Sequence, residues 1–168
     1  DGLVSITGTP YDTMQTVIGY AHESTGSLKE FGIKYDELPM QDSGVDLAGI
    51  SRVITPETKV ALIQRSRGYS ERRPLSIADI REITARVKAA NPACICFVDN
   101  CYGEFVDTSE PTDVETVDIM AGSLIKNPGG GLAPTGGYIA GRGDLVEAAS
   151  YRLTAPGMGD ELGASLTS

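Results

Sequence analysis

The chain has 168 residues, 40% of them hydrophobic, with 14 basic against 23 acidic residues and a formal net charge of −9. This length and composition predict one globular domain over residues 1–168 rather than a disordered chain. The acidic balance, without a run of basic residues, argues against nucleic acid and anionic membranes as partners. No apolar run is long enough to span a membrane, and the single histidine argues against a zinc site. The three cysteines cannot all pair in disulfides and two lie in an apolar run, so we expect a reducing, cytoplasmic setting.

Short apolar runs alternate with helical patterns along the chain. The runs cover residues 3–6, 60–63, 94–98, 117–121 and 137–140, and the helical patterns cover residues 12–22 and 76–90. Such alternation predicts an α/β fold, a mostly parallel sheet covered by helices in three α/β/α layers. His22 falls in the first helical pattern, where we interpret it as structural or solvated.

The clearest predicted helix covers residues 76–90. Its apolar residues recur at spacings of three and four, Ser76 with Asp79 resembles a capping box, and Asn91-Pro92 ends it. The stripe consists of Ile77, Ile80, Ile83 and Val87.

Asp99 directly follows the apolar run 94–98, at the predicted carboxyl end of a buried strand. Open parallel sheets form their ligand crevices at these ends. A carboxylate is costly to bury there without a cationic partner. The alternative is that Asp99 only accepts hydrogen bonds from backbone amides in the turn.

Lys126 lies 27 positions after Asp99, behind another buried run and before Asn-Pro-Gly-Gly-Gly. We expect its amine to sit in a crevice, where burial and nearby positive charge would lower its pKa and help it act as a nucleophile. Pyridoxal 5'-phosphate needs this pair, because a lysine holds its aldehyde as an imine while an acid keeps its ring nitrogen protonated. A lysine without such a context is normally on the surface.

Two further residues are candidates for the same site. Ser123 lies three residues before Lys126, within reach of the phosphate of a cofactor bonded to that lysine, although a serine also ends strands for local reasons. Tyr11 follows the turn after the first strand and could stack on the cofactor and transfer a proton, or simply begin a helix. Tyr102, three residues past Asp99, has a weaker claim and could only pack against the rim.

A cluster of four arginines lies within nine positions: Arg65, Arg67, Arg72 and Arg73. The simple interpretation is a solvated loop. The functional one is that Arg65 or Arg67 binds a substrate carboxylate or the cofactor phosphate.

Taken together, these motifs resemble the large domain of fold-type I pyridoxal-phosphate enzymes of the Cys/Met-metabolism branch. The order is Asp99-Asn100-x-Tyr102, then Ser123-x-x-Lys126, then a Gly-rich loop leading into residues 136–141. Residues 5–13, 63–69 and 126–131 are most similar to the methionine gamma-lyase-related proteins, also called aluminium resistance proteins. The resemblance extends over all 168 residues.

This resemblance implies a role for each candidate. Lys126 would be the Schiff-base lysine, Asp99 the pyridinium partner, Ser123 a phosphate ligand and Tyr11 the ring-stacking and acid/base tyrosine. Ile125 stands where the better-known lyases carry a threonine that also binds the phosphate. Family members are more than twice as long, so we expect this chain to be the cofactor-binding core without the N-terminal segment and the C-terminal small domain. The full-length form is expected to be a homodimer or homotetramer.

The leading hypothesis is therefore a lyase acting on a sulfur-containing amino acid, in which Lys126 moves the alpha proton and Asp99 stabilises the resulting carbanion through the ring. An aminotransferase or a threonine-aldolase-like enzyme of the same fold is the first alternative. A truncated, non-catalytic remnant that binds a partner is the second.

Overall fold

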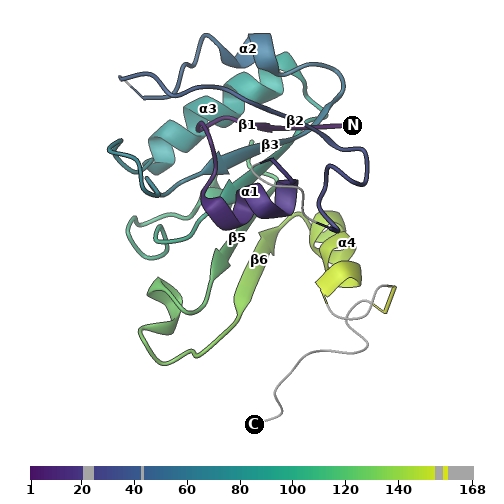
Figure 1. The fold of residues 1–168 in the computed structure, drawn as a ribbon. Coiled ribbons are helices and arrows are strands. Elements are labelled where there is room, and N and C mark those ends of the chain that lie inside the picture. Colours follow the sequence, from purple (N-terminus) through teal and green to yellow (C-terminus); the bar gives the residue numbers. More distant parts are fainter. Residues whose placement is uncertain (21–24, 43, 154–156, 159–168) are drawn as a thin grey trace.

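One six-stranded sheet forms the centre of the molecule (Figure 1). The structure is a computed structural model, and it describes residues 1–20, 25–42, 44–153 and 157–158. The strands are β1 (Gly2–Ser5), β2 (Lys34–Glu37), β3 (Thr58–Gln64), β4 (Ile95–Asp99), β5 (Ile119–Ser123) and β6 (Gly137–Gly141). The helices of the described residues are α1 (Asp12–Ile18), α2 (Ile50–Val53), α3 (Ile77–Ala90) and α4 (Gly143–Leu153), with the 3-10 turns η1 (Pro111–Asp113) and η2 (Asn127–Gly129).

The strand order is β2-β1-β3-β4-β5-β6. All neighbours pair in parallel except β5 and β6, which are antiparallel. The prediction of a mostly parallel α/β sheet is therefore confirmed, and the carboxyl ends of β1 to β5 meet at one edge. The edge strand β2 and the helices α2 and α4 were not predicted. For β2 the reason is that its residues alternate between half-buried and exposed positions and form no apolar run.

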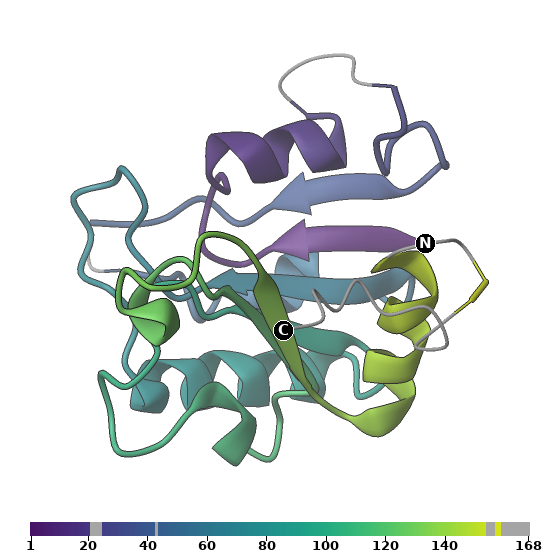
Figure 2. The same cartoon turned by 90° about the horizontal axis from the view of Figure 1, so that it is seen from below.

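Helices cover the two faces of the sheet and make three layers. In β3, Ala61 and Ile63 pack with α2 and α3 in the larger core, whereas Leu62 packs on the opposite face with Ile18 of α1. This alternation follows from the two-residue period of a strand. Figure 2 shows α1 and α3 on opposite sides of the strands.

Helix α3 matches its prediction closely. The Ser76 hydroxyl accepts a hydrogen bond from the Asp79 amide, and the Asp79 carboxylate accepts one from the Ser76 amide, which completes the capping box. Helix α1 is shorter than predicted, because Gly19 adopts a left-handed conformation (φ 83°) after Ile18 and ends it. His22 lies outside the described residues.

An ionic cluster around Asp118, just before β5, joins α3, β4 and the segment after β6. The carboxylate accepts hydrogen bonds from Lys88 Nζ (2.6 Å), the Cys96 amide (2.8 Å) and Arg142 Nη1 (3.0 Å). Burial alone would raise the pKa of Asp118, but these donors outweigh it and hold the pKa below its usual value. The cluster thus favours a charged carboxylate at the amino end of β5.

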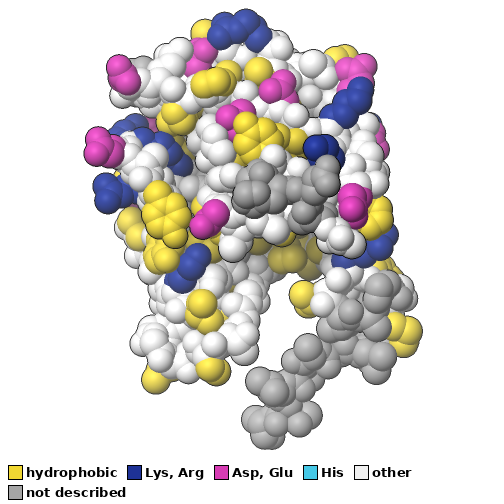
Figure 3. All heavy atoms as spheres, in the orientation of Figure 1, with side chains coloured by type: hydrophobic (Ala, Val, Ile, Leu, Met, Phe, Trp, Pro, Cys, Tyr) yellow, Lys and Arg dark blue, Asp and Glu magenta, His cyan; other side chains and the backbone are white. Residues whose placement is uncertain are grey.

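The surface agrees with the mixed charge of the sequence. On the face shown in Figure 3, lysine and arginine side chains are interspersed with acidic ones rather than gathered into a patch. No helix among the described residues is long and apolar enough to cross a membrane. Within the same residues, no group of three or more histidine, cysteine or acidic side chains is placed to hold a metal ion.

Candidate active site

A cleft of about 420 Å³ lies at the carboxyl edge of the sheet, above the ends of β3 and β4. It is lined by three of the four predicted site residues, namely Tyr11, Asp99 and Lys126. They come from three different segments, which the parallel topology brings to one edge. The volume is in the usual range for a small-molecule site.

Asp99 is the last residue of β4 and is 8% exposed. Its Oδ1 accepts a hydrogen bond from the Cys101 amide at 3.0 Å. This is the bond to a backbone amide of the turn that was given above as the alternative role of Asp99. No cation among the described residues forms an ion pair with Asp99. A buried carboxylate that faces a cleft without a paired cation suits a cationic ligand group.

Lys126 stands at the start of η2, and its Nζ lies 4.6 Å from the ring centroid of Tyr102. Burial would lower the pKa of the Lys126 amine, but the Cys101 side chain, Tyr102 and Asp99 outweigh that effect and raise the pKa. The expectation of a lowered pKa is therefore wrong for this structure. The reason is that the neighbours of the amine are acidic groups rather than cations.

Tyr11 immediately precedes α1, and it is half-buried against the cleft. Its backbone amide donates a hydrogen bond to Gln64 Oε1 at 3.2 Å, which connects the start of α1 to the end of β3. Tyr11 lines the same cleft as Asp99 and Lys126. Tyr102 lies on the same cleft in a left-handed backbone conformation (φ 66°).

Ser123 is the one predicted residue that does not line this cleft. It ends β5, pairs with Gly137 of β6 and accepts a backbone hydrogen bond from the Lys126 amide at 3.4 Å. Its side chain is half-buried. The role of Ser123 as a phosphate ligand therefore stays a prediction.

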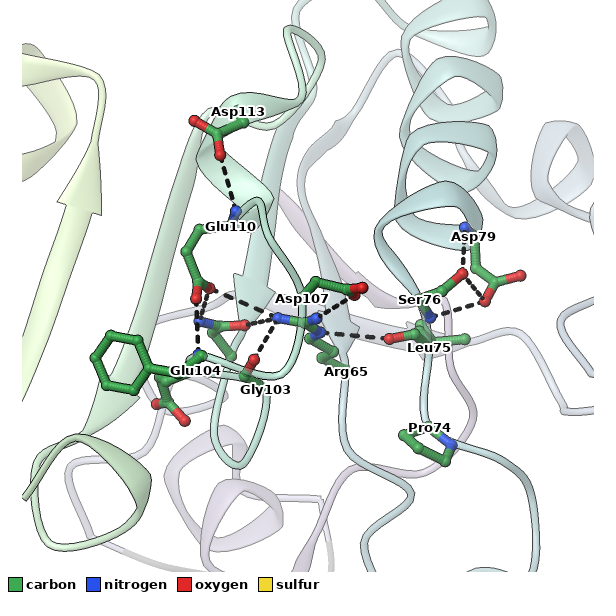
Figure 4. A network of polar contacts seen from close by, with 12 residues as sticks. Arg65, Pro74, Leu75, Ser76, Asp79, Gly103, Glu104, Asp107, Glu110 and Asp113 are labelled. Atoms are coloured by element: carbon green, nitrogen blue, oxygen red, sulfur yellow. Dashed lines mark hydrogen bonds and ion pairs between the residues drawn. The ribbon is translucent and has the colours of Figure 1, made fainter. Parts of the chain in front are cut away.

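Arg65 is part of the structural framework, not of the ligand site (Figure 4). It is 2% exposed, and its guanidinium donates to Leu75 O, Asn100 Oδ1, Gly103 O and Asp107 Oδ2. A Cβ at Gly103 would lie 2.5 Å from Arg65 Cδ, so the glycine makes room for this side chain. Because its donors are used internally, the hypothesis that Arg65 binds a substrate carboxylate or phosphate is wrong.

Arg67, two residues later, is exposed at the rim of the cleft region. Within the described residues its guanidinium forms no ion pair, since the ion pairs there involve other cations. The hypothesis that an arginine of this loop binds a substrate carboxylate or the cofactor phosphate therefore remains a prediction for Arg67.

Several residues that line the cleft were not predicted as site residues, and two of them differ in the signal they carry. Cys101 and Gln64 both line it. Gln64 ends β3 just as Asp99 ends β4, so the same rule of polar residues at strand ends would have found it. Cys101 carries no such signal, because a cysteine beside an apolar strand is typical of a buried hydrophobe.

The parallel sheet, its one antiparallel edge strand and the cleft at its carboxyl edge define the fold of the large domain of fold-type I pyridoxal-phosphate enzymes. An aminotransferase of this kind from Streptococcus suis superposes with a TM-score of 0.64 over 90% of this chain and 38% of its own, at 18% identity, which shows the fold alone. The chain belongs to the methionine gamma-lyase family, whose model matches residues 1–168.

Other relatives are more similar in sequence. Protein YnbB from Bacillus subtilis is 51% identical over 170 residues, which are all of this chain and 40% of that protein. A solved structure described as a carbon-sulfur lyase involved in aluminium resistance, from Clostridium novyi NT, has a TM-score of 0.90 at 51% identity and covers 97% of this chain and 39% of its own. The chain thus spans about 40% of the length of these relatives.

Proposed function

We propose that this chain is the cofactor-binding core of a pyridoxal-phosphate-dependent carbon-sulfur lyase that acts on a sulfur-containing amino acid. The observation that carries the proposal is the placement of Asp99, Lys126 and Tyr11 around one cleft. The family membership and the lyase name of a relative with 51% identity support it.

The residues present fit pyridoxal phosphate. When bound, this group supplies an aldehyde that condenses with amines and a pyridinium ring that accepts electrons from the substrate carbon. Asp99 would keep the ring nitrogen protonated, because its buried carboxylate favours a cation beside it. Lys126 would hold the aldehyde carbon and, once displaced by the substrate amine, move the alpha proton.

Tyr11 would cover the ring and give a proton to the departing sulfur. Its position supports this role, because its backbone is fixed to Gln64 at the edge of the cleft while its side chain makes no hydrogen bond that would tie up the phenol within the described residues. A phenol can serve as a general acid in this way. We keep Ser123 as a candidate phosphate ligand on the resemblance alone.

Absorbance spectroscopy tests the proposal. Pyridoxal phosphate is added to the purified chain, to Lys126→Ala and to the control Lys59→Ala, whose lysine is exposed on β3. We expect the imine band in the chain and in Lys59→Ala and its loss in Lys126→Ala. A band that survives in Lys126→Ala would contradict the assignment of the lysine, and no band in any protein would favour the non-catalytic remnant.

Product analysis separates the lyase from the other enzymes of this fold. A lyase releases a thiol, ammonia and a keto acid from the substrate and consumes one water. An aminotransferase retains the sulfur, and an aldolase-like enzyme cleaves a carbon-carbon bond. The full-length enzyme is the form to assay, because the chain spans about 40% of its relatives.

We also propose that the full-length form is a homodimer or homotetramer. Large aromatic side chains that line the cleft are exposed, including Tyr69 at 90% and Tyr102 at 59%. Exposed apolar groups gathered near a site are typical of an interface. Light scattering on the full-length form should give a multiple of the subunit mass, and a monomer at micromolar concentration would contradict the proposal.

A further inference from the structure

Tyr102 adopts a backbone conformation that its own side chain disfavours. It is one of two residues other than glycine with a positive φ in the part of the chain that the structure describes, and its φ is 66°. A bulky side chain in this left-handed region is strained, and such strain persists only where the surroundings enforce it. The ring is 59% exposed, so burial in the core does not explain why a tyrosine occupies this position.

The residues on both sides of Tyr102 fix this conformation. The Cys101 amide donates a hydrogen bond to Asp99 Oδ1 at 3.0 Å, and the Gly103 amide donates one to Asn100 O at 2.8 Å. The turn after β4 is therefore closed before and after the tyrosine. The direction in which the Tyr102 ring points is set by this turn rather than by packing of the ring itself.

The ring that is held in this way faces the amine of Lys126. The Lys126 Nζ lies over the Tyr102 ring, 4.6 Å from its centroid. At this distance the negative face of an aromatic ring attracts a cation. Because the attraction is electrostatic, it acts on the ammonium form of the lysine and not on the neutral amine. The contact therefore favours a charged Lys126.

The other titratable groups of the cleft act in the same direction, because each of them is neutral or negative. The groups that line the cleft with Lys126 are Tyr11, Asp12, Tyr69, Asp99, Cys101 and Tyr102. No second lysine or arginine is found among the described residues of this lining. Burial would lower the pKa of the Lys126 amine, but the Cys101 side chain, Tyr102 and Asp99 outweigh it and raise the pKa.

We propose that Tyr102 is a positioning residue for Lys126, whose ring holds the ammonium in place until the amine loses its proton. The ammonium releases its proton to solvent, leaves the ring, and the neutral nitrogen then attacks an aldehyde carbon with loss of one water. The contact between ring and ammonium does not depend on the proposed function. Its consequence, that cofactor loading is controlled by the protonation of Lys126, rests on that function.

Reductive methylation of the cofactor-free chain tests the contact without pyridoxal phosphate. Formaldehyde with cyanoborohydride methylates neutral amines, and mass spectrometry of the digested chain gives the rate at each lysine as a function of pH. The midpoint of the curve for Lys126 reports the pKa of its amine. Lys59, exposed on β3, is the reference within the same molecule.

Variants of Tyr102 identify the ring as the partner. Tyr102→Leu removes the ring, so the midpoint for Lys126 should fall by about 0.5 pH unit and the rate below the midpoint should rise about threefold. Tyr102→Phe keeps the ring and should keep the parent midpoint. Tyr69→Leu, which removes another exposed tyrosine of the same cleft, is the matched control. A parent midpoint in Tyr102→Leu would overturn the proposal, and so would equal falls in Tyr102→Leu and Tyr102→Phe, since these would assign the effect to the phenol.

Tyr102→Gly separates positioning from a purely structural role. Glycine adopts a positive φ without strain, so the urea midpoint of unfolding should not fall in this variant. The methylation midpoint of Lys126 should nevertheless fall as it does in Tyr102→Leu. A lower urea midpoint together with an unchanged Lys126 curve would show that Tyr102 serves the fold, and would overturn the proposal.

The outcome is separable from that of the proposed function. With pyridoxal phosphate at neutral pH, Tyr102→Leu should form the imine band about threefold faster than the parent chain. A methylation midpoint that falls in Tyr102→Leu, without an imine band in the parent chain, would contradict the lyase proposal alone. An imine band in the parent chain with an unchanged midpoint in Tyr102→Leu would contradict the positioning role alone.

Discussion

Replacing Arg65 with methionine should destabilise the chain strongly, although no predicted ligand contact is lost. The substitution leaves Asn100 Oδ1, Gly103 O and the acidic groups of Asp107 and Glu110 without their cation. The buried Asn100 Oδ1 and Gly103 carbonyl each lose a donor, at about 1–3 kcal/mol apiece, whereas the Asp107 and Glu110 carboxylates are 44% and 29% exposed and add little because water solvates them. The expected loss is therefore about 3–5 kcal/mol. This is a large part of the roughly 5–15 kcal/mol by which domains are stable.

Urea unfolding followed by circular dichroism measures this loss. With an m-value of about 2 kcal/mol/M, the midpoint should fall by roughly 1.5–2.5 M. Arg67→Met is the matched control, and because that side chain is exposed its free energy of unfolding should change by about 0.5 kcal/mol or less. A loss below about 1 kcal/mol in Arg65→Met, or equal losses in both variants, would refute the structural role of Arg65.

Three further predictions concern stability and reactivity. Asp118 has a depressed pKa in the folded chain, so its contribution to the free energy of unfolding is present above the unfolded pKa of about 3.9 and is lost as the pH falls through the folded value. The free energy of unfolding should therefore fall less steeply with decreasing pH in Asp118→Asn than in the parent chain. Equal slopes would argue against the cluster. Ser76→Ala should lower the free energy of unfolding by about 1 kcal/mol through loss of the α3 cap, with Ser51→Ala unchanged in the same urea assay. Burial raises the pKa of Cys94 to about 11 and of Cys96 to about 12, and both thiols are buried whereas Cys101 is half-buried. A thiol reagent should therefore modify Cys101 first and the other two only on unfolding, as read by mass spectrometry. Early modification of Cys96 would contradict its burial.

The sequence was sufficient to predict the sheet and the edge at which the site lies. Apolar runs identified the buried strands, and Asp99 was placed at a strand end because a charged residue ends such a run. The same reasoning could not find β2, whose side chains alternate between half-buried and exposed positions. The direction of β6 was also not predictable, because hydrophobic pattern does not encode strand direction.

The candidate site was predicted less completely, for reasons of side-chain surroundings. Four arginines in one loop look equivalent in sequence. Arg65, however, follows directly on β3 and is buried against Asn100 and Gly103, while Arg67 is exposed. The raised pKa of Lys126 depends on Cys101 and Tyr102, which come from a segment far away in the chain. Contacts of this kind become visible only when the fold brings the segments together.

The most direct test of the central claim is to find which amine captures the cofactor. The chain is incubated with pyridoxal phosphate, reduced with borohydride and digested, and the modified peptide is sequenced by mass spectrometry. Of its five lysines, the account predicts that Lys126 carries the pyridoxyl group, and that Asp99→Asn weakens cofactor binding without moving the label. Label spread over Lys29, Lys34 and Lys59, with Lys126 unmodified, would contradict it.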